Sequence, residues 1–264
     1  MNAVEYLYKG NADKVLNFSG GTHHGRSSFA SGFCFLNDCI LAIIKAINLG
    51  FKKILYVDID AHHCDAVQDY FIDNENVVLI SIHERNRWPK TGLISDCSHK
   101  NILNIPVPEH LNDPEMKTIL KNLILPYSKT QKFDLTIIQA GTDCLNEDPQ
   151  SKMKLSNNIY WYLLSKLKEL TKKTLILGGG GYNPYITAKA WAGNWLVLNN
   201  NEHLLNLDLN QECRKLLCSL KWDNIRVKNS IPEKWLRSWR DPQGKNIVRH
   251  EILKLIDDIL EYKK

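Results

Sequence analysis

Short apolar runs recur along the chain, and each is bounded by polar or glycine residues. They lie at residues 15–18, 54–57, 77–82, 135–140 and 174–177. Runs of this length that are rich in Val, Ile and Leu are typical of strands buried on both faces of a parallel sheet. A further segment at 104–108 is expected to be extended because of its prolines.

Helical patterns occupy most of the segments between these runs. A helix from Asn37 or Asp38 to Leu49 has a capping residue before it and Gly50 as its stop. The other predicted helices lie at 1–10, 65–71, 113–129, 152–171, 185–198 and 246–262. The segment 199–245 is expected to be irregular. Strands alternating with helices predict an α/β fold with a doubly wound, mostly parallel sheet, in one domain over 1–264.

Unusual polar residues follow directly after the predicted strands. These clusters are His23 and His24, Asp58 with Asp60 and His62, Asp143, and the glycine-rich segment Gly178–Tyr182. In open parallel sheets, binding sites lie beyond the carboxyl ends of the strands. The four clusters are therefore expected to meet at one site, although a solvated acidic loop remains an alternative for the group at 58–62.

The residue types in these clusters predict a metal-dependent amide hydrolase. Asp60, His62 and Asp143 would hold a divalent ion and leave positions open for water and a carbonyl oxygen. A nearby His pair can move the proton, and a Tyr hydroxyl such as that of Tyr182 can donate to an oxyanion.

Two acidic residues are expected to act indirectly. Asp58 and Asp65 are candidates for fixing the imidazole tautomers. A phosphate-binding role for the GGGGYN segment is disfavoured, because it lacks a following Lys-Ser/Thr and has Asn183 where a nucleotide fingerprint needs glycine.

Composition places the chain among ordinary globular proteins. It has 264 residues, of which 44% are hydrophobic and 24% charged, and a net charge of +5. This mild charge does not favour direct nucleic acid binding, and no segment approaches the about 18 apolar residues of a membrane span. The seven cysteines form no CxxC pair and suggest reduced thiols. A cytoplasmic location is expected, with the nucleus as the alternative if the source is eukaryotic.

Five motifs resemble the histone deacetylase family, which includes acetoin-utilisation and acetylpolyamine deacetylases. In chain order they are SGGTHHG, ASGFCFLND, ILYVDIDAHHCDAVQDYF, QAGTD and LGGGGYN. The resemblance runs from about Asp13 to Leu198 and is nearest to the class I and acetoin-utilisation branch. It implies an arginase/deacetylase-like three-layer α/β/α fold and hydrolysis of acetylated lysine side chains, or of related acetylated polyamines or small amines.

The resemblance also implies residue roles. Asp60, His62 and Asp143 match the zinc ligands, although Fe²⁺ or Co²⁺ would also suit such a site. His24 matches the principal general base and acid, and His23 its electrostatic neighbour. The remaining implied assignments are Asp58 and Asp65 as orienting residues, Tyr182 as the carbonyl-polarising residue, Gly32, Phe33, Trp88 and Gly180 at the substrate tunnel, and Asp58, Asp60, His62, Ser81 and Ile82 around a structural K⁺.

The chain departs from the family pattern at several points. Cys64, Ala66 and Lys90 stand where the family usually has glycine, so strain is expected if a position needs a positive φ. Only 22 residues precede His23, where family members have about a hundred, so the domain is expected to lack its N-terminal segment and to leave a sheet edge bare.

These departures keep two alternatives open. One is a catalytically impaired acetyl-lysine-binding relative, and the other, weaker, is an arginase-like ureohydrolase with two manganese ions. The natural substrate and the oligomeric state are not determined by the sequence.

Overall fold

One parallel sheet organises the protein. The computed structural model describes residues 1–242, 244 and 247–263, and within them the sheet has six strands in the order β1-β6-β5-β2-β3-β4, all paired in parallel. The strands are β1 (Lys14–Asn17), β2 (Ile54–Asp58), β3 (Val77–Glu84), β4 (Ile102–Val107), β5 (Leu135–Gln139) and β6 (Lys173–Leu177). The predicted mostly parallel α/β sheet is confirmed.

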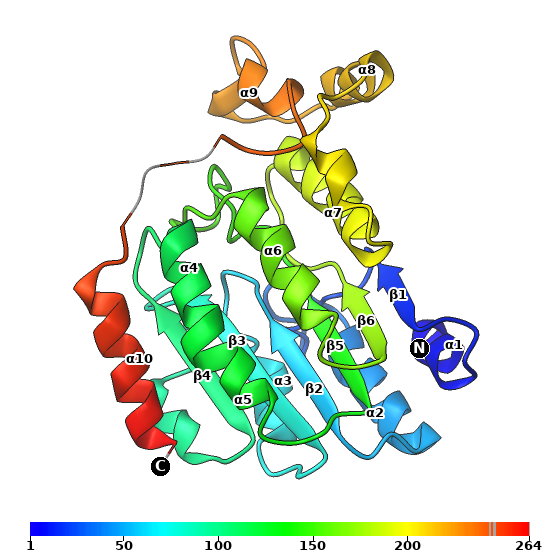
Figure 1. Ribbon diagram of the computed structural model, residues 1–264, viewed down its shortest axis with the longest axis vertical. Coiled ribbons are helices and arrows are strands. Elements are labelled where there is room, and N and C mark those ends of the chain that lie inside the picture. The colour runs from blue at the N-terminus through cyan, green and yellow to red at the C-terminus, as the bar shows by residue number, and fades with distance from the viewer. Residues whose placement is uncertain (243, 245–246, 264) are drawn as a thin grey trace.

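Helices cover both faces of this sheet (Figure 1). One layer consists of α1 (Asn2–Tyr8), α2 (Asp38–Leu49) and α3 (Asp65–Phe71). The other consists of α4 (Asp113–Ile119), α5 (Leu125–Ser128), α6 (Asn157–Leu167), α7 (Pro184–Leu198) and α10 (His250–Tyr262), with a π-helical turn, Leu120–Ile124, joining α4 to α5. The result is the three-layer α/β/α arrangement.

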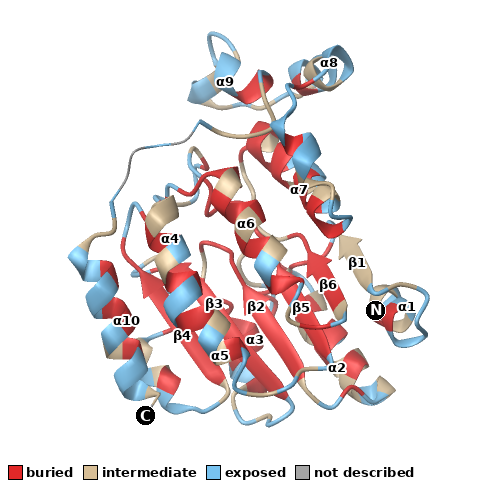
Figure 2. Ribbon diagram, in the orientation of Figure 1, coloured by how far each residue is buried: buried red, intermediate tan, exposed pale blue. Residues whose placement is uncertain are grey.

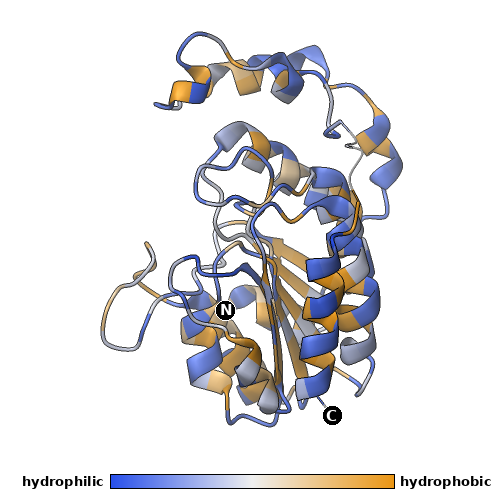
Figure 3. Cartoon of the chain, turned by 90° about the vertical axis from the view of Figure 1, so that its left-hand side faces the viewer, coloured by the Kyte–Doolittle hydropathy of each residue, from blue (hydrophilic) through white to orange (hydrophobic). Residues whose placement is uncertain are grey.

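Alternation along the strands creates two hydrophobic cores. In β2, Leu55 and Val57 belong to the core beneath α4, α6 and α7, while Ile54 and Tyr56 belong to the core beneath α2 and α3. Successive side chains of a strand point to opposite faces, so an unbroken apolar run is needed to supply both cores. Figure 2 shows the central strands as a buried layer, and Figure 3 shows their hydrophobic character between hydrophilic outer helix surfaces.

Local signals fixed some helix ends better than others. Asn37 caps α2 by accepting from the Ile40 amide, and Gly50 ends it with φ of 107°, both as predicted. The prediction for 152–171 was wrong at both ends, because Ser156 caps α6 and the helix ends at Leu167.

The C-terminal predictions needed two further corrections. The helix predicted from Asn246 begins at His250, and Asn246 itself lies outside the described residues. The segment expected to be irregular contains α8 (Gln211–Ser219) and α9 (Glu233–Leu236), which lie beyond α7 in Figure 1. Trp235 of α9 stacks on Tyr185 with ring centroids 5.5 Å apart, so tertiary packing holds this short helix.

The sheet ends at β1 on one side. All residues of β1 are partly exposed, and within the described residues its sheet partner is β6 alone. This makes β1 an edge strand, and the expectation that a missing segment leaves an edge bare stays a prediction. None of the helices that the structure describes has both the length and the apolar character needed to cross a membrane.

Candidate metal and catalytic site

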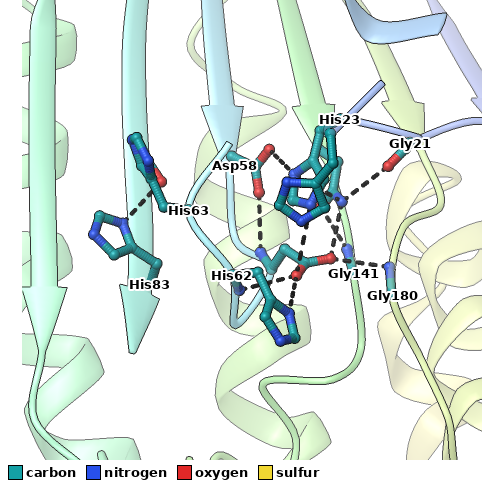
Figure 4. Close-up of polar contacts among 12 residues, drawn as sticks. Gly21, His23, Asp58, His62, His63, His83, Gly141 and Gly180 are labelled. Atoms are coloured by element: carbon teal, nitrogen blue, oxygen red, sulfur yellow. Dashed lines mark hydrogen bonds and ion pairs between the residues drawn. The ribbon is translucent and has the colours of Figure 1, made fainter. Parts of the chain in front are cut away.

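The site lies beyond the carboxyl ends of four neighbouring strands, β1, β6, β5 and β2. His23 and His24 follow β1, Asp60 and His62 follow β2, and Asp143 follows β5. Because β1, β6, β5 and β2 are adjacent in that order, their following loops meet above one part of the sheet edge. Figure 4 shows His23, Asp58 and His62 in one cluster that also contacts the backbone at Gly180.

Three predicted ligands converge. One ligand atom from each of Asp60, His62 and Asp143 lies within 4.8 Å of the others. The Nδ1 atom of His62 is 3.1 Å from Asp60 Oδ1 and 2.9 Å from Asp143 Oδ2. Both carboxylates are buried, and buried charges of this kind are stable only when paired or bound to a cation.

Backbone amides hold the two carboxylates in place. The Gly180 amide donates to Asp60 Oδ2 at 2.9 Å, and the Ala61 amide donates to Asp143 Oδ1 at 2.8 Å. Gln139 also donates through Nε2 to Asp60 Oδ2 at 2.9 Å. The carboxylates are thus oriented by the surrounding chain, as ligands of a protein metal site are.

The electrostatics of this cluster favour a positive charge at its centre. Burial opposes protonation of His62, but its hydrogen bonds to Asp143 and Asp60 outweigh burial and raise its pKa to about 10. Burial and the neighbouring Asp60 carboxylate raise the pKa of Asp143 to about 7. A nitrogen and carboxylate oxygens are also the donor set that Zn²⁺ accepts, so these residues fit a divalent ion.

The two histidines are held by separate carboxylates. His23 Nδ1 donates to Asp58 Oδ2 at 2.8 Å, and His24 Nδ1 donates to Asp65 Oδ1 at 2.7 Å. The two imidazole rings lie 4.0 Å apart. Each Nδ1 therefore carries a hydrogen, which leaves each Nε2 as the atom that accepts or releases a proton.

The same surroundings separate the pKa values of this pair. Burial disfavours a charged His23, but Asp58 and Asp60 overcome it and raise its pKa to about 9. Burial and the charge on His23 lower the pKa of His24, against the opposing influence of Asp65. Neutral His24 beside charged His23 is an arrangement in which one imidazole can act as a base.

A cavity of about 190 Å³ opens onto this cluster. Gly32, Phe33 and Tyr182 line it together with His24 and His62. The Phe33 and Tyr182 rings are 6.1 Å apart. Burial, and then the Asp143 charge, raise the pKa of the Tyr182 hydroxyl, which therefore keeps its proton at neutral pH.

Trp88 lies beside two histidines of the site. Its ring contacts His24 at 4.6 Å and His62 at 6.3 Å between centroids. It lines a neighbouring hollow with Arg85 and Arg87, while Gly32 packs between His24 and Trp88. The role of Trp88 as the second tunnel wall therefore stays a prediction.

The residues expected around K⁺ lie together. Asp58 and Ser81 are paired across β2 and β3, and Ile82 continues β3. The His83 ring contacts Ser81 Oγ through Nδ1 at 3.0 Å and donates through Nε2 to the Gly92 carbonyl at 3.0 Å. Because Nε2 carries the hydrogen, the Ser81 hydroxyl donates to His83 and keeps its lone pairs free for a cation.

Strain occurs at only one of the three glycine replacements. Cys64 has φ of −75°, and Ala66 lies inside α3, so neither needs a glycine. Lys90 has φ of 65°, the left-handed region that favours glycine. Burial holds the pKa of the Cys64 thiol well above its usual range, which fits an inert thiol.

Several residues that organise the site were not singled out from the sequence. Gln139 donates to Asp60, Tyr56 donates to Asp58 Oδ2 at 2.6 Å, and Asp148 accepts from the Tyr182 amide at 2.7 Å. Gln139 and Tyr56 carry a local signal, since each places a polar group within or at the end of an otherwise apolar strand. Asp148 offered none.

Comparison with known proteins agrees with this geometry. A family model described as "Histone deacetylase domain" matches residues 1–198. The chain belongs to the histone deacetylase family. Among curated relatives, histone deacetylase 6 of Arabidopsis thaliana is 32% identical over 196 residues, covering 72% of this chain and 41% of the relative. Histone deacetylase 8 of Xenopus laevis is 32% identical over 197 residues, with 72% and 60% covered.

Solved structures of the family share the fold over the whole chain. A histone deacetylase homologue from Aquifex aeolicus superposes with a TM-score of 0.89 and 33% identity, covering 100% of this chain and 70% of the homologue. A histone deacetylase homologue complexed with SAHA gives the same values. The chain thus spans less than half the length of the Arabidopsis relative and about two thirds of the solved homologue.

Proposed function

We propose that this protein is a zinc-dependent deacetylase that removes acetyl groups from lysine side chains of proteins, or from related acetylated amines. The observation that carries the proposal is the meeting of Asp60, His62 and Asp143 with His24 and Tyr182 at one cavity. Family membership supports the same chemistry.

Asp60, His62 and Asp143 would hold the metal ion. A bound Zn²⁺ would polarise the amide carbonyl and acidify a water molecule. Gln139 and the Gly180 amide keep the Asp60 carboxylate in its orientation, so the donor atoms need little rearrangement. Fe²⁺ or Co²⁺ would be accepted by the same donors.

The imidazoles would move the proton. His24, whose pKa is lowered by burial, accepts the proton of the attacking water at Nε2 and passes it to the departing amine. Asp65 holds His24 in the required tautomer, and Asp58 does the same for His23. Tyr182 keeps its hydroxyl proton and donates it in a hydrogen bond to the developing oxyanion.

The remaining residues would shape access and support. Phe33 and Gly32 border the channel for the methylene stem of the acylated lysine, with Gly180 beside the ligands and Trp88 as the outer wall. A K⁺ ion held by main-chain oxygens of Asp58, Asp60, His62 and Ile82 and by the Ser81 hydroxyl would brace the loop after β2.

The test is zinc-dependent release of acetate from an acetyl-lysine peptide by the purified chain. Tyr182→Phe should lower turnover by about 100-fold to 1,000-fold, because one oxyanion donor is lost. SAHA binding, measured by calorimetry, should persist in the variant. Tight SAHA binding without any turnover by the wild type would instead identify a catalytically impaired binding relative.

A further inference from the structure

A second cavity lies at the end of the sheet opposite the metal site. It has a volume of about 520 Å³ and is enclosed by the amino end of β4, the 3₁₀ turn Ile94–Ser98, α5 and the last turn of α10 (Figure 1). The metal ligands follow the carboxyl ends of their strands, whereas Leu103, which lines this cavity, is the second residue of β4. The cavity is therefore separate from the metal site.

Most of the cavity wall is apolar. Leu103 and Leu123 are buried on its inner side, whereas Leu260 and Tyr262 of α10 are 42% and 51% exposed. Exposed apolar side chains are stabilised when a ligand removes them from water. The volume also lies within the range of roughly 300–1,000 Å³ that is typical of small-molecule sites. The wall thus suits the apolar body of a small molecule.

Lys263 places an ammonium group at this wall. Its Nζ donates to the His99 carbonyl at 2.8 Å and lies 4.9 Å from the centroid of the Tyr127 ring. The Tyr127 hydroxyl donates to the Lys100 carbonyl, so it can accept a bond from Lys263 Nζ, 3.4 Å away. Because an ammonium group carries three hydrogens, Lys263 keeps one for an anion in the cavity.

The charges around the cavity are not balanced by its own lining. Among the described residues that form it are Lys100 and Lys263, but no aspartate or glutamate. Asp96, the acidic residue of the 3₁₀ turn, accepts from the Gln68 side chain at 3.0 Å. Burial lowers the pKa of Lys263, so its positive charge is incompletely compensated. A bound anion would supply the missing charge.

We propose that this cavity binds a small amphipathic carboxylate, namely a medium-chain fatty acid. The carboxylate would pair with Lys263 and Lys100, and the alkyl chain would lie against the leucines of the wall. The lining contains no arginine, the residue whose forked donors favour phosphate, so a carboxylate is the better match for the two ammonium groups. Neither the metal site nor the proposed deacetylation is needed for this binding.

Calorimetry with hexanoate, octanoate and decanoate on the purified chain tests the proposal. Each added methylene should raise the affinity by about twofold to fourfold, because it removes further apolar surface from water. Decanol has the decyl chain without the charge, and it should bind about tenfold more weakly than decanoate. Equal affinity for hexanoate and decanoate, or for decanoate and decanol, would overturn the proposal.

A blocking variant locates the binding. Ser98→Trp places a large ring in the cavity and should weaken decanoate binding by about tenfold or more, because the alkyl chain loses its buried place. Ser95→Trp is the matched control, since Ser95 is an exposed serine of the same turn that does not line the cavity. A carboxylate held at the metal site instead would bind both variants as it binds the wild type, and that result refutes the assignment.

A charge variant tests the head-group contact, with circular dichroism as the check on folding. Lys263→Gln should weaken decanoate binding by about tenfold and leave decanol binding unchanged. Lys121→Gln removes an exposed lysine that lies outside the cavity, and it should bind both probes as the wild type does. Equal losses for decanoate and decanol in Lys263→Gln would refute the pairing. These measurements require no turnover, so their outcome is independent of the proposed function.

Discussion

The histidine pair illustrates how single residues divide one task. His23 and His24 are adjacent and both buried, yet their pKa values move in opposite directions. His23 has two carboxylates close to its ring, whereas His24 has Asp65 and a charged neighbour. Neutral His24 can accept a proton near neutral pH, so the acidic limb of the pH–rate profile should report its pKa.

Asp65→Asn tests this division. Asp65 raises the pKa of His24, so its loss should lower that pKa and move the acidic limb of kcat/KM to lower pH. Because Asp65 also fixes the tautomer through a 2.7 Å contact, the maximal rate should fall about 10-fold to 100-fold. The measurement is kcat/KM on an acetyl-lysine peptide from pH 5 to 9.

Asp69→Asn is the matched control for this variant. Asp69 is an exposed partner of Arg26, which also pairs with Asp65, but it does not touch His24. Its profile should overlay that of the wild type. A reduced rate in Asp65→Asn with an unmoved limb would show that the carboxylate does not influence the titration of His24.

At the scale of elements, the site depends on the close approach of three loops to one another. The loop after β6 places Gly180 against Asp143 and Asp60, which come from the loops after β5 and β2. A Cβ on Gly180 would lie 2.3 Å from Asp143 Oδ2 and 3.0 Å from Asp60 Oδ2. Glycine at this position is therefore required by the carboxylates beside it.

Gly180→Ala should weaken zinc binding by about 10-fold to 100-fold, because both carboxylates must shift from the positions set by their backbone donors. Competition with a chromogenic chelator measures the affinity, and circular dichroism checks the fold. Gly193→Ala is the control: its Cβ would lie 2.3 Å from Trp161 between α6 and α7, so it should cost about 1–3 kcal/mol of stability without weakening zinc binding. Equal zinc affinity in Gly180→Ala and wild type would contradict this account.

Elements also show where local signals suffice. Asn37 and Gly50 set the ends of α2 within a few residues of sequence, so the prediction there was confirmed. The helix α9 has four residues, Glu233–Leu236, and no side-chain cap hydrogen bond, so nothing local distinguishes it from a loop. Its stacking on Tyr185 joins segments that are distant in the chain, which no window of sequence contains.

At the scale of the whole molecule, an ion pair between a partly exposed arginine and a buried carboxylate ties the C-terminal helix to the α4 layer. Arg249, just before α10, donates from Nε and Nη2 to Glu115 at 2.6 and 2.8 Å, and the Glu115 side chain is fully buried. Burial opposes the charge on Glu115, but the bonds from Arg249 and from backbone amides outweigh it and lower its pKa.

Glu115→Gln should make the molecule less stable and change its pH dependence. Since the folded pKa lies below the unfolded value of about 4.3, the carboxylate stabilises the fold above that value and loses this effect as the pH falls through the folded pKa. The variant should lose about 1.5–3 kcal/mol at pH 7, and the difference from wild type should shrink below about pH 4. Urea unfolding at several pH values measures both.

The exposed pair between Arg85 and Glu251 provides the comparison, because both side chains are about half exposed. Glu251→Gln should cost at most about 1 kcal/mol at pH 7. A pH-independent difference between Glu115→Gln and wild type would rule out the charge as the cause.

The sequence by itself determined the parallel sheet, the order of its chemistry along the chain and the candidate ligands. It did so because buried strands appear in the sequence as short apolar runs. Parallel strands then bring the polar residues at their carboxyl ends to the same edge of the sheet. Asp60, His62 and Asp143 were predicted in this way, and the structure brings them together.

Only the tertiary structure decided which groups surround those candidates. These contacts join residues that are far apart in the chain. They are the contacts of Gln139 with Asp60, of Asp38 with Thr22 and of Glu115 with Arg249, and the packing of Trp88 at the site. Such contacts follow from packing between layers, which residue patterns along one segment do not encode.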